Sequence, residues 1–93
     1  MTTNTGTAAS VSVGALLRQW RMHRRVGQLE LSNEAATSPR HLSFVETGRS
    51  QPSRDMVLRI AEHLDVPLRD RNQLLMAAGF APRYSENDLA SPG

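Results

Sequence analysis

The amino-acid sequence predicts an all-α domain built from five helices, and three observations support this class. Aromatic residues are few (Trp20, Phe44, Phe80 and Tyr84), so the core must be aliphatic, which favours helices over a β-sandwich. No segment alternates apolar and polar residues with the period of two that marks a half-buried strand. The 93 residues suffice for one domain but not for two of ordinary size.

The first two helices are indicated by apolar residues at helical spacing. The first spans roughly residues 13–25, and its apolar face comprises Val13, Leu16, Leu17 and Trp20. The second spans about residues 28–35 and directs Leu31 and Ala35 inward. Ser32 lies where this helix must approach the next one closely, because only a short turn joins them. A small side chain is therefore expected there.

The remaining helices are marked by their ends. Ser38 is a favourable N-cap for the third helix, Pro39 suits its first position, and Gly48 suits the left-handed residue that stops it. Ser53 caps the fourth helix, whose apolar residues recur at i, i+3, i+4 and i+7: Val57, Ile60, Ala61 and Leu64. Pro67 separates it from the fifth helix, which has the predicted buried positions Leu68, Leu74, Leu75 and Ala78. Gly79 and Phe80 are typical of a helix stop with a hydrophobic contact, and Pro82 prevents continuation.

Residues 13–80 are therefore expected to form the domain. Residues 1–12 contain little that could be buried, and we expect a flexible tail. Residues 81–93 are expected to be a second tail or the start of a linker. The absence of cysteine excludes disulfides and thiolate metal sites. No apolar run approaches the roughly 20 residues of a membrane span, and no secretory signal is present, so a cytoplasmic protein is expected.

Positive charge is supplied by arginine alone. The net charge is only +2, yet residues 13–49 contain six Arg against three Glu, and the chain has no Lys. The guanidinium fork binds two acceptors at once, which suits phosphate and guanine. Codon usage in a GC-rich genome explains the absence of Lys equally well, but it does not change what the Arg side chains can bind.

The third helix carries an unusual outward face. At about 100° per residue, Leu42 and Val45 share one side, and the other side presents Arg40, Ser43, Phe44 and Thr47. Solvated helix faces usually carry Lys, Glu and Gln. A guanidinium, two hydroxyls and a ring instead suit the hydrogen-bonding edges and methyl groups of a DNA groove. By pattern alone, the second and third helices form either a DNA-binding helix-turn-helix or a generic helical hairpin.

A family resemblance favours the first alternative. The matching residues are Val13-Gly14, Leu17-Arg18, Arg21, Gln28, Leu31, Ser38, Leu42, Val45-Glu46, Gly48, Pro52-Ser53, Leu58 and Ile60-Ala61. In this order, over about two-thirds of the chain, they resemble the phage-repressor-like (Xre) helix-turn-helix regulators, the family of Cro and lambda repressor. Residues 40–82 resemble a bacterial subgroup in which a larger MmyB-like ligand-binding domain follows. That domain is not in this sequence, so we expect either a short member or part of a longer protein.

The resemblance implies a five-helix, lambda-repressor-like domain that binds double-stranded DNA, with the helix-turn-helix at helices two and three. Gln28 would touch a phosphate and brace the recognition helix, and Ser38 would cap that helix and bind a phosphate or a base edge. Arg40, Ser43, Phe44 and Thr47 would face the major groove, with Arg49 near the backbone. Arg40 is the expected reader of guanine O6 and N7, and Phe44 either contacts a thymine methyl or packs in the core. Such regulators usually bind as dimers, so we expect a homodimer on DNA and a nucleoid-associated location.

Arg21 and Glu46 are expected to play a structural part. Arg21 borders the apolar face of the first helix, and Glu46 lies near the buried side of the third. A charge at such a position needs a partner. The resemblance implies a partly buried ion pair between these two residues, and the alternative is two solvated charges.

Three positions depart from the family pattern. Gly27 replaces the usual Ser or Thr cap, Ala36 stands at a turn where Gly is usual, and Thr37 replaces a Val. A left-handed Ala costs roughly 1 kcal/mol, whereas Gly as a cap costs a few tenths. None of these positions is an expected DNA contact.

Other functions find less support in the sequence. His23, His41 and His63 are far apart, Glu62-His63 lacks the second His of a zinc protease motif, and no phosphate-binding or nucleophile motif is present. We therefore expect no enzyme, no metal site and no cofactor. Arg24-Arg25 fits an anionic membrane patch or a position near DNA. The alternative function is a protein-interaction adaptor or antitoxin with the same fold.

Overall fold

Five α-helices and no strand make up the described part of the chain, residues 12–84 of the computed structural model. In chain order the helices are α2 (Val13–His23), α3 (Gln28–Glu34), α4 (Pro39–Glu46), α5 (Arg54–His63) and α6 (Leu68–Ala77). The all-α class and the five helices are as predicted. Residues 1–11 and 85–93 lie outside the described residues, and with them most of the two predicted tails.

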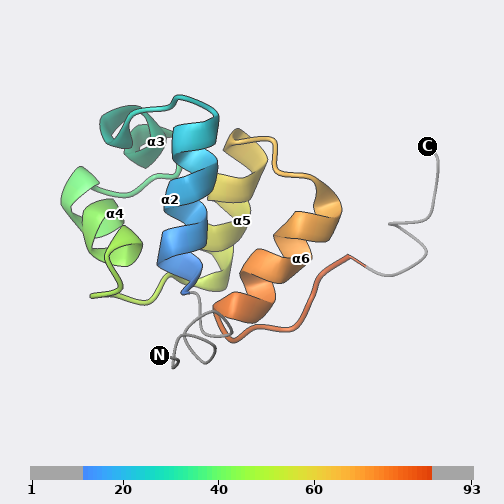
Figure 1. Cartoon of the computed structure of the whole chain (residues 1–93). Coiled ribbons are helices and arrows are strands. Elements are labelled where there is room, and N and C mark those ends of the chain that lie inside the picture. Colours follow the sequence, from blue (N-terminus) through green and yellow to red (C-terminus); the bar gives the residue numbers. More distant parts are fainter. Residues whose placement is uncertain (1–11, 85–93) are drawn as a thin grey trace, which may run out of the picture.

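The helices are arranged around α2, which crosses the middle of the view in Figure 1. α3 and α4 lie on one side of it, and α6 lies on the other. α2 contacts α4 and α6, α3 contacts α4 and α5, and α5 contacts α6. Their buried faces share one aliphatic core, whose residues are Val13, Leu17, Leu31, Ala35, Leu42, Val45, Met56, Val57, Ile60, Ala61, Leu64, Val66, Leu74 and Leu75.

Serine side chains cap three of the helices at their N-termini. Ser12, Ser38 and Ser53 each accept a hydrogen bond from the backbone N–H three residues on, at 3.1, 3.0 and 3.1 Å. Each bond satisfies a donor that has no partner inside the helix. α3 begins instead at Gly27, whose backbone is extended and which offers no side-chain acceptor. The caps at Ser38 and Ser53 were predicted from the sequence.

All five helices end in the same hydrogen-bonded turn. The residue after the C-cap adopts a left-handed conformation, and the next backbone N–H donates to a carbonyl five residues back, at 2.8 to 3.1 Å. This pattern is the Schellman motif. Glycine fills the left-handed position after α4 and α6, at Gly48 and Gly79, as predicted. After α2, α3 and α5, the position is held by Arg25, Ala36 and Asp65, with φ of 59°, 57° and 54°.

Gly14 permits the close contact between α2 and α4. A Cβ atom built on Gly14 would lie 1.9 Å from the carbonyl oxygen of Val45. No real Cβ occupies such a position, so any other residue would force the two helices apart. A glycine in the first turn of a helix costs roughly 1 kcal/mol in propensity, and this contact explains its presence.

Two expectations about the helices were wrong. The first helix ends at His23, and Arg25 already has a left-handed backbone. Leu68, predicted to be buried, is 36% exposed. It shares a helical row with Leu75, but it is the first residue of α6, and the core does not extend to that turn. Helical spacing predicts on which side of a helix a side chain lies. It does not predict which turns of the helix are covered by the rest of the domain.

The chain after α6 returns along that helix. The Asn72 side chain, in a residue only 8% exposed, donates to the Tyr84 carbonyl at 2.8 Å and accepts from the backbone N–H groups of Arg83 and Tyr84 at 3.1 and 3.0 Å. Arg71 lies beside this contact. Burial opposes its charge, but hydrogen bonds to Tyr84 and Glu62 outweigh that effect and raise the pKa of the guanidinium above its usual value. Contacts with the domain therefore continue to Tyr84.

Among residues 12–84, no helix is both long enough and apolar enough to cross a membrane.

Candidate nucleic-acid interface

α3 and α4 form a tight helical pair joined by residues 35–38. Ser32 is fully buried, and its hydroxyl donates to the Leu29 carbonyl at 2.8 Å, so a small polar side chain does occupy the position expected to be crowded. Ala36 has a left-handed φ of 57°, and the Thr37 N–H donates to the Ser32 carbonyl at 2.9 Å. The turn therefore has the expected geometry although Ala replaces Gly.

α4 has one buried side and one outward side. Leu42, Val45 and Glu46 are 0%, 1% and 5% exposed and fix the helix to the domain. The structure places the predicted contact residues on the other side: Arg40 and Thr47 are exposed, and Ser43 and Phe44 are half-buried. Ser38 and Arg49, just before and after the helix, are also exposed. The side that carries the hydrogen-bonding groups is thus the side that faces away from the core.

Two guanidinium groups lie against the ring of Phe44. The Cζ of Arg40 is 5.4 Å from the ring centroid and the Cζ of Arg49 is 5.3 Å from it. Both distances fall within the range of a cation–π interaction. Phe44 is not among the partly buried apolar side chains that pack against the core within the described residues. The ring therefore belongs to the outward surface and contacts the two cations there.

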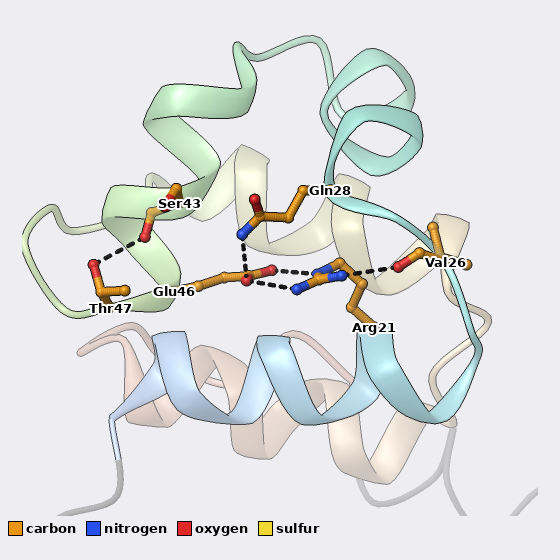
Figure 2. Close-up of polar contacts among 6 residues, drawn as sticks. All are labelled: Arg21, Val26, Gln28, Ser43, Glu46 and Thr47. Carbon is orange, nitrogen blue, oxygen red and sulfur yellow. Dashed lines mark hydrogen bonds and ion pairs between the residues drawn. The ribbon is translucent and has the colours of Figure 1, made fainter.

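Behind this surface, Glu46 lies at the centre of a hydrogen-bonded cluster (Figure 2). Its carboxylate accepts from Nε of Arg21 at 2.7 Å and from Nη2 at 3.0 Å, a bidentate ion pair between α2 and α4. The Arg21 and Glu46 side chains are 12% and 1% exposed. Arg21 also donates to the Val26 carbonyl at 2.9 Å, which holds the loop before α3. The sequence-predicted pair is brought together at a partly buried position.

Gln28 joins the same cluster. Its side-chain amide donates to Oε1 of Glu46 at 3.0 Å, so the first residue of α3 is tied to the last residue of α4 (Figure 2). An amide nitrogen carries two hydrogens, and this bond uses one of them. Gln28 therefore braces α4 and keeps one donor free.

Two hydroxyl groups near the ends of α4 have internal roles. The Ser38 oxygen accepts from the His41 N–H at 3.0 Å as the N-cap, which leaves its own hydrogen free. The Thr47 hydroxyl donates to the carbonyl of Ser43 at 2.9 Å (Figure 2). It also donates to the carbonyl of Phe44 at 3.3 Å. Thr47 is the C-cap of α4, so its hydroxyl hydrogen satisfies the end of the helix and is not available to a ligand.

Arg24 has a role that the sequence did not indicate. Its Nε donates to the Leu64 carbonyl at 2.9 Å and its Nη2 to the Asp65 carbonyl at 3.1 Å, while its Cζ lies 5.3 Å from the Trp20 ring centroid. The guanidinium thus joins the C-terminal ends of α2 and α5. Arg24 therefore has a structural role within the domain. Because its partners are backbone carbonyls 40 and 41 positions further along the chain, no local sequence signal could have revealed them.

A short α3, a tight turn and an exposed α4 braced from behind define a helix-turn-helix domain. The family model described as a helix-turn-helix domain matches residues 12–74, which is more than half of the chain. The chain belongs to this family. No curated protein and no solved structure matches it.

Proposed function

We propose that this domain binds double-stranded DNA in a sequence-specific manner, with α4 in the major groove. One observation carries the proposal: α4 is fixed from behind by buried residues and presents Arg40, Ser43 and Phe44 on its outward side. Within residues 12–84, no carboxylate forms an ion pair with Arg40 or Arg49. Two cations without a carboxylate partner in this part of the chain, at the exposed side of a recognition helix, fit a polyanion with readable edges.

The proposed base contacts follow from the hydrogen-bonding and apolar groups that each side chain can offer to DNA. Arg40 reads guanine O6 and N7, the commonest specific contact that Arg makes in the major groove. Ser43 donates to a base edge. Thr47 offers its methyl group and its acceptor lone pairs, because its hydrogen is bonded to Ser43 and Phe44.

The backbone contacts come from three other residues. Ser38 has a free hydroxyl hydrogen, Gln28 has a free amide hydrogen, and Arg49 has a charged fork. Each can donate to a phosphate oxygen. Such contacts position the protein on the duplex without reading sequence.

At the level of the organism, we infer a bacterial transcriptional regulator of the phage-repressor-like (Xre) type that acts in the cytoplasm, at the nucleoid. It would bind as a homodimer to two half-sites about one helical turn apart. Residues 40–82 resemble regulators in which an MmyB-like ligand-binding domain follows. This resemblance supports the proposal that such a domain follows here as well. These finer statements depend on the sequence resemblance and on the family.

Selection of bound duplexes from random DNA tests the proposal. We expect enrichment of a defined motif, and a two-fold symmetric motif if the protein binds as a dimer. Affinity for the enriched site should fall with salt, with a log–log slope of roughly −0.9 per phosphate neutralised. Arg49→Ala should reduce the magnitude of the slope by about 1 for each subunit bound, because one phosphate contact is lost.

Arg59→Ala is the matched control for the loss of one positive charge. Arg59 is exposed on α5 and has no proposed contact, so its removal should leave the slope nearly unchanged. Absence of any enriched motif, together with undetectable binding at low salt, would contradict DNA binding. That result would support the adaptor or antitoxin alternative.

A further inference from the structure

The contact of two guanidiniums with one ring has a consequence for recognition. From this geometry we propose that Phe44 is a positioning residue, which holds Arg40 and Arg49 in their binding orientations before DNA arrives. The inference rests on the proposed function and deepens it, because it replaces the expected contact of Phe44 with a thymine methyl. In this arrangement Phe44 acts on DNA through the two arginines.

The first support is the way the backbone brings the three side chains together. Arg40 and Phe44 are four residues apart on α4, so their side chains are neighbours on the helix surface. Arg49 arrives from the other direction. Gly48, with φ of 83°, reverses the chain, and the Arg49 N–H donates to the Phe44 carbonyl at 2.8 Å. A helix and its terminal turn thus place both guanidiniums within 5.4 Å of the ring centroid.

The second support is the type of residue found in the turn after α4. In a Schellman motif, the second residue after the C-cap commonly makes a hydrophobic contact with the last turn of the helix. Four helices have Val26, Thr37, Val66 or Phe80 at this position, all with an apolar group to bury. At α4 the position is held by Arg49, and its partner in the last turn is Phe44. The usual apolar contact is here a cation–π contact on the outward side of the recognition helix.

The third support is energetic. Arg side chains lose much rotamer freedom when they are immobilised, and a pre-ordered group loses less on binding. The ring restricts two such side chains at once. Two like charges near one ring also repel each other, and a phosphate or guanine acceptor relieves that repulsion. The free protein therefore holds both cations in place against their mutual repulsion, and an anionic partner removes that repulsion.

The first experiment measures the free protein. The side-chain methylene protons of Arg40 and Arg49 should show upfield ring-current shifts in NMR spectra. Phe44→Leu should abolish these shifts, and Phe44→Tyr should retain them, because only Tyr keeps a ring. Wild-type shifts at random-coil values would overturn the proposal, whether or not the protein binds DNA.

The second experiment is a double-mutant cycle on the selected duplex at low salt. Phe44→Leu should reduce affinity about tenfold, and Phe44→Tyr should remain within about threefold of wild type. In an Arg40→Ala/Arg49→Ala background, Phe44→Leu should have almost no further effect. A full tenfold loss in that background would overturn the proposal, since it would show that Phe44 contacts DNA by itself.

Controls separate an effect of Phe44 on the two arginines from a loss of folding. They also separate it from failure of the domain to bind DNA at all. Phe80→Leu removes a half-buried ring at the end of α6, so it should lower the melting temperature without changing DNA affinity at a temperature where the variant is folded. Thermal melts of the Phe44 variants must show a folded domain at the binding temperature. Failure of the wild type to bind any duplex would contradict the proposed function, and the ring-current result would still decide whether Phe44 orders the two arginines.

Discussion

The Glu46 carboxylate is almost fully removed from water, and its interactions show how α4 is held. It accepts hydrogen bonds from both sides, two from Arg21 on α2 and one from Gln28 on α3. A buried carboxylate is costly unless it is paired and hydrogen-bonded. One side chain therefore connects three helices, and both of its partners are needed to satisfy it.

Arg21→Met should lower the free energy of unfolding by about 3 kcal/mol, because a buried carboxylate would lose its partner. Urea denaturation at neutral pH measures this change. Adding Glu46→Leu to Arg21→Met should recover much of the loss, since well-packed apolar residues can replace a buried ion pair. Wild-type stability in Arg21→Met would show that the ion pair does not stabilise the domain.

Gly14→Ala should destabilise the domain by about 2 to 3 kcal/mol, or prevent folding. The added methyl group would overlap the Val45 carbonyl, and α2 would have to move away from α4. Gly27→Ala is the control, because a Cβ at Gly27 has no atom within 4 Å. It should cost no more than about 1 kcal/mol, as Ala is a poorer N-cap than Gly. Equal stability of the two variants would rule out the close approach as the reason for Gly14.

At the scale of the elements, the helix ends are set by adjacent residues. The contacts between helices instead involve residues that are far apart in the sequence. Ser38, Ser53, Gly48 and Gly79 marked helix ends in the sequence because caps and left-handed stops depend on adjacent residues only. Periodicity likewise identified the buried rows of α2 and α5. These features were predictable without any knowledge of the tertiary structure.

The features that escaped prediction depend on distant partners. Nothing in the sequence marked Asn72, which is buried by the chain that returns after α6. Arg24 is exposed, and its donation to carbonyls at the end of α5 was not predicted. The outward face of α4 was predicted as a set, but the contact of Phe44 with Arg49 was not, because it depends on how Gly48 turns the chain.

Ala36→Gly should stabilise the turn between α3 and α4 by about 0.5 to 1 kcal/mol. Ala36 has a φ of 57°, where glycine is free of the steric penalty that a Cβ introduces. The same change at Ala77, an exposed helical position in α6, should instead reduce stability by up to about 1 kcal/mol. Thermal denaturation of both variants provides the comparison. A destabilised Ala36→Gly would mean that the left-handed turn is not strained.

At the scale of the whole molecule, α2 supports both the helix-turn-helix and α6. It contacts α4 through Gly14 and Arg21, and it also contacts α6. The outward face of α4 therefore lies on a well-packed support, which the proposed reading of base edges would require. Asn72 also holds Arg83 and Tyr84 against α6.

Asn72→Ala should release residues 83 and 84 while the rest of the domain stays folded. The backbone N–H groups of Arg83 and Tyr84 both donate to the Asn72 side chain. Their amide hydrogens should therefore exchange slowly in the wild type and at near-unprotected rates in the variant. Amides in the core of α5 should remain protected and serve as the internal control. Unchanged protection of Arg83 and Tyr84 would show that the Asn72 side chain does not hold these two residues.

The central claim is that α4 reads DNA sequence, and Arg40 is its proposed base reader. The most direct measurement is the affinity of wild type and Arg40→Ala for the selected site and for every single-base variant of it. We predict that Arg40→Ala loses discrimination at one G·C pair in each half-site, worth about 1 to 3 kcal/mol, and keeps its preferences elsewhere. An equal loss of affinity for all sequences would contradict this role, because it would show that Arg40 contacts only the phosphate backbone.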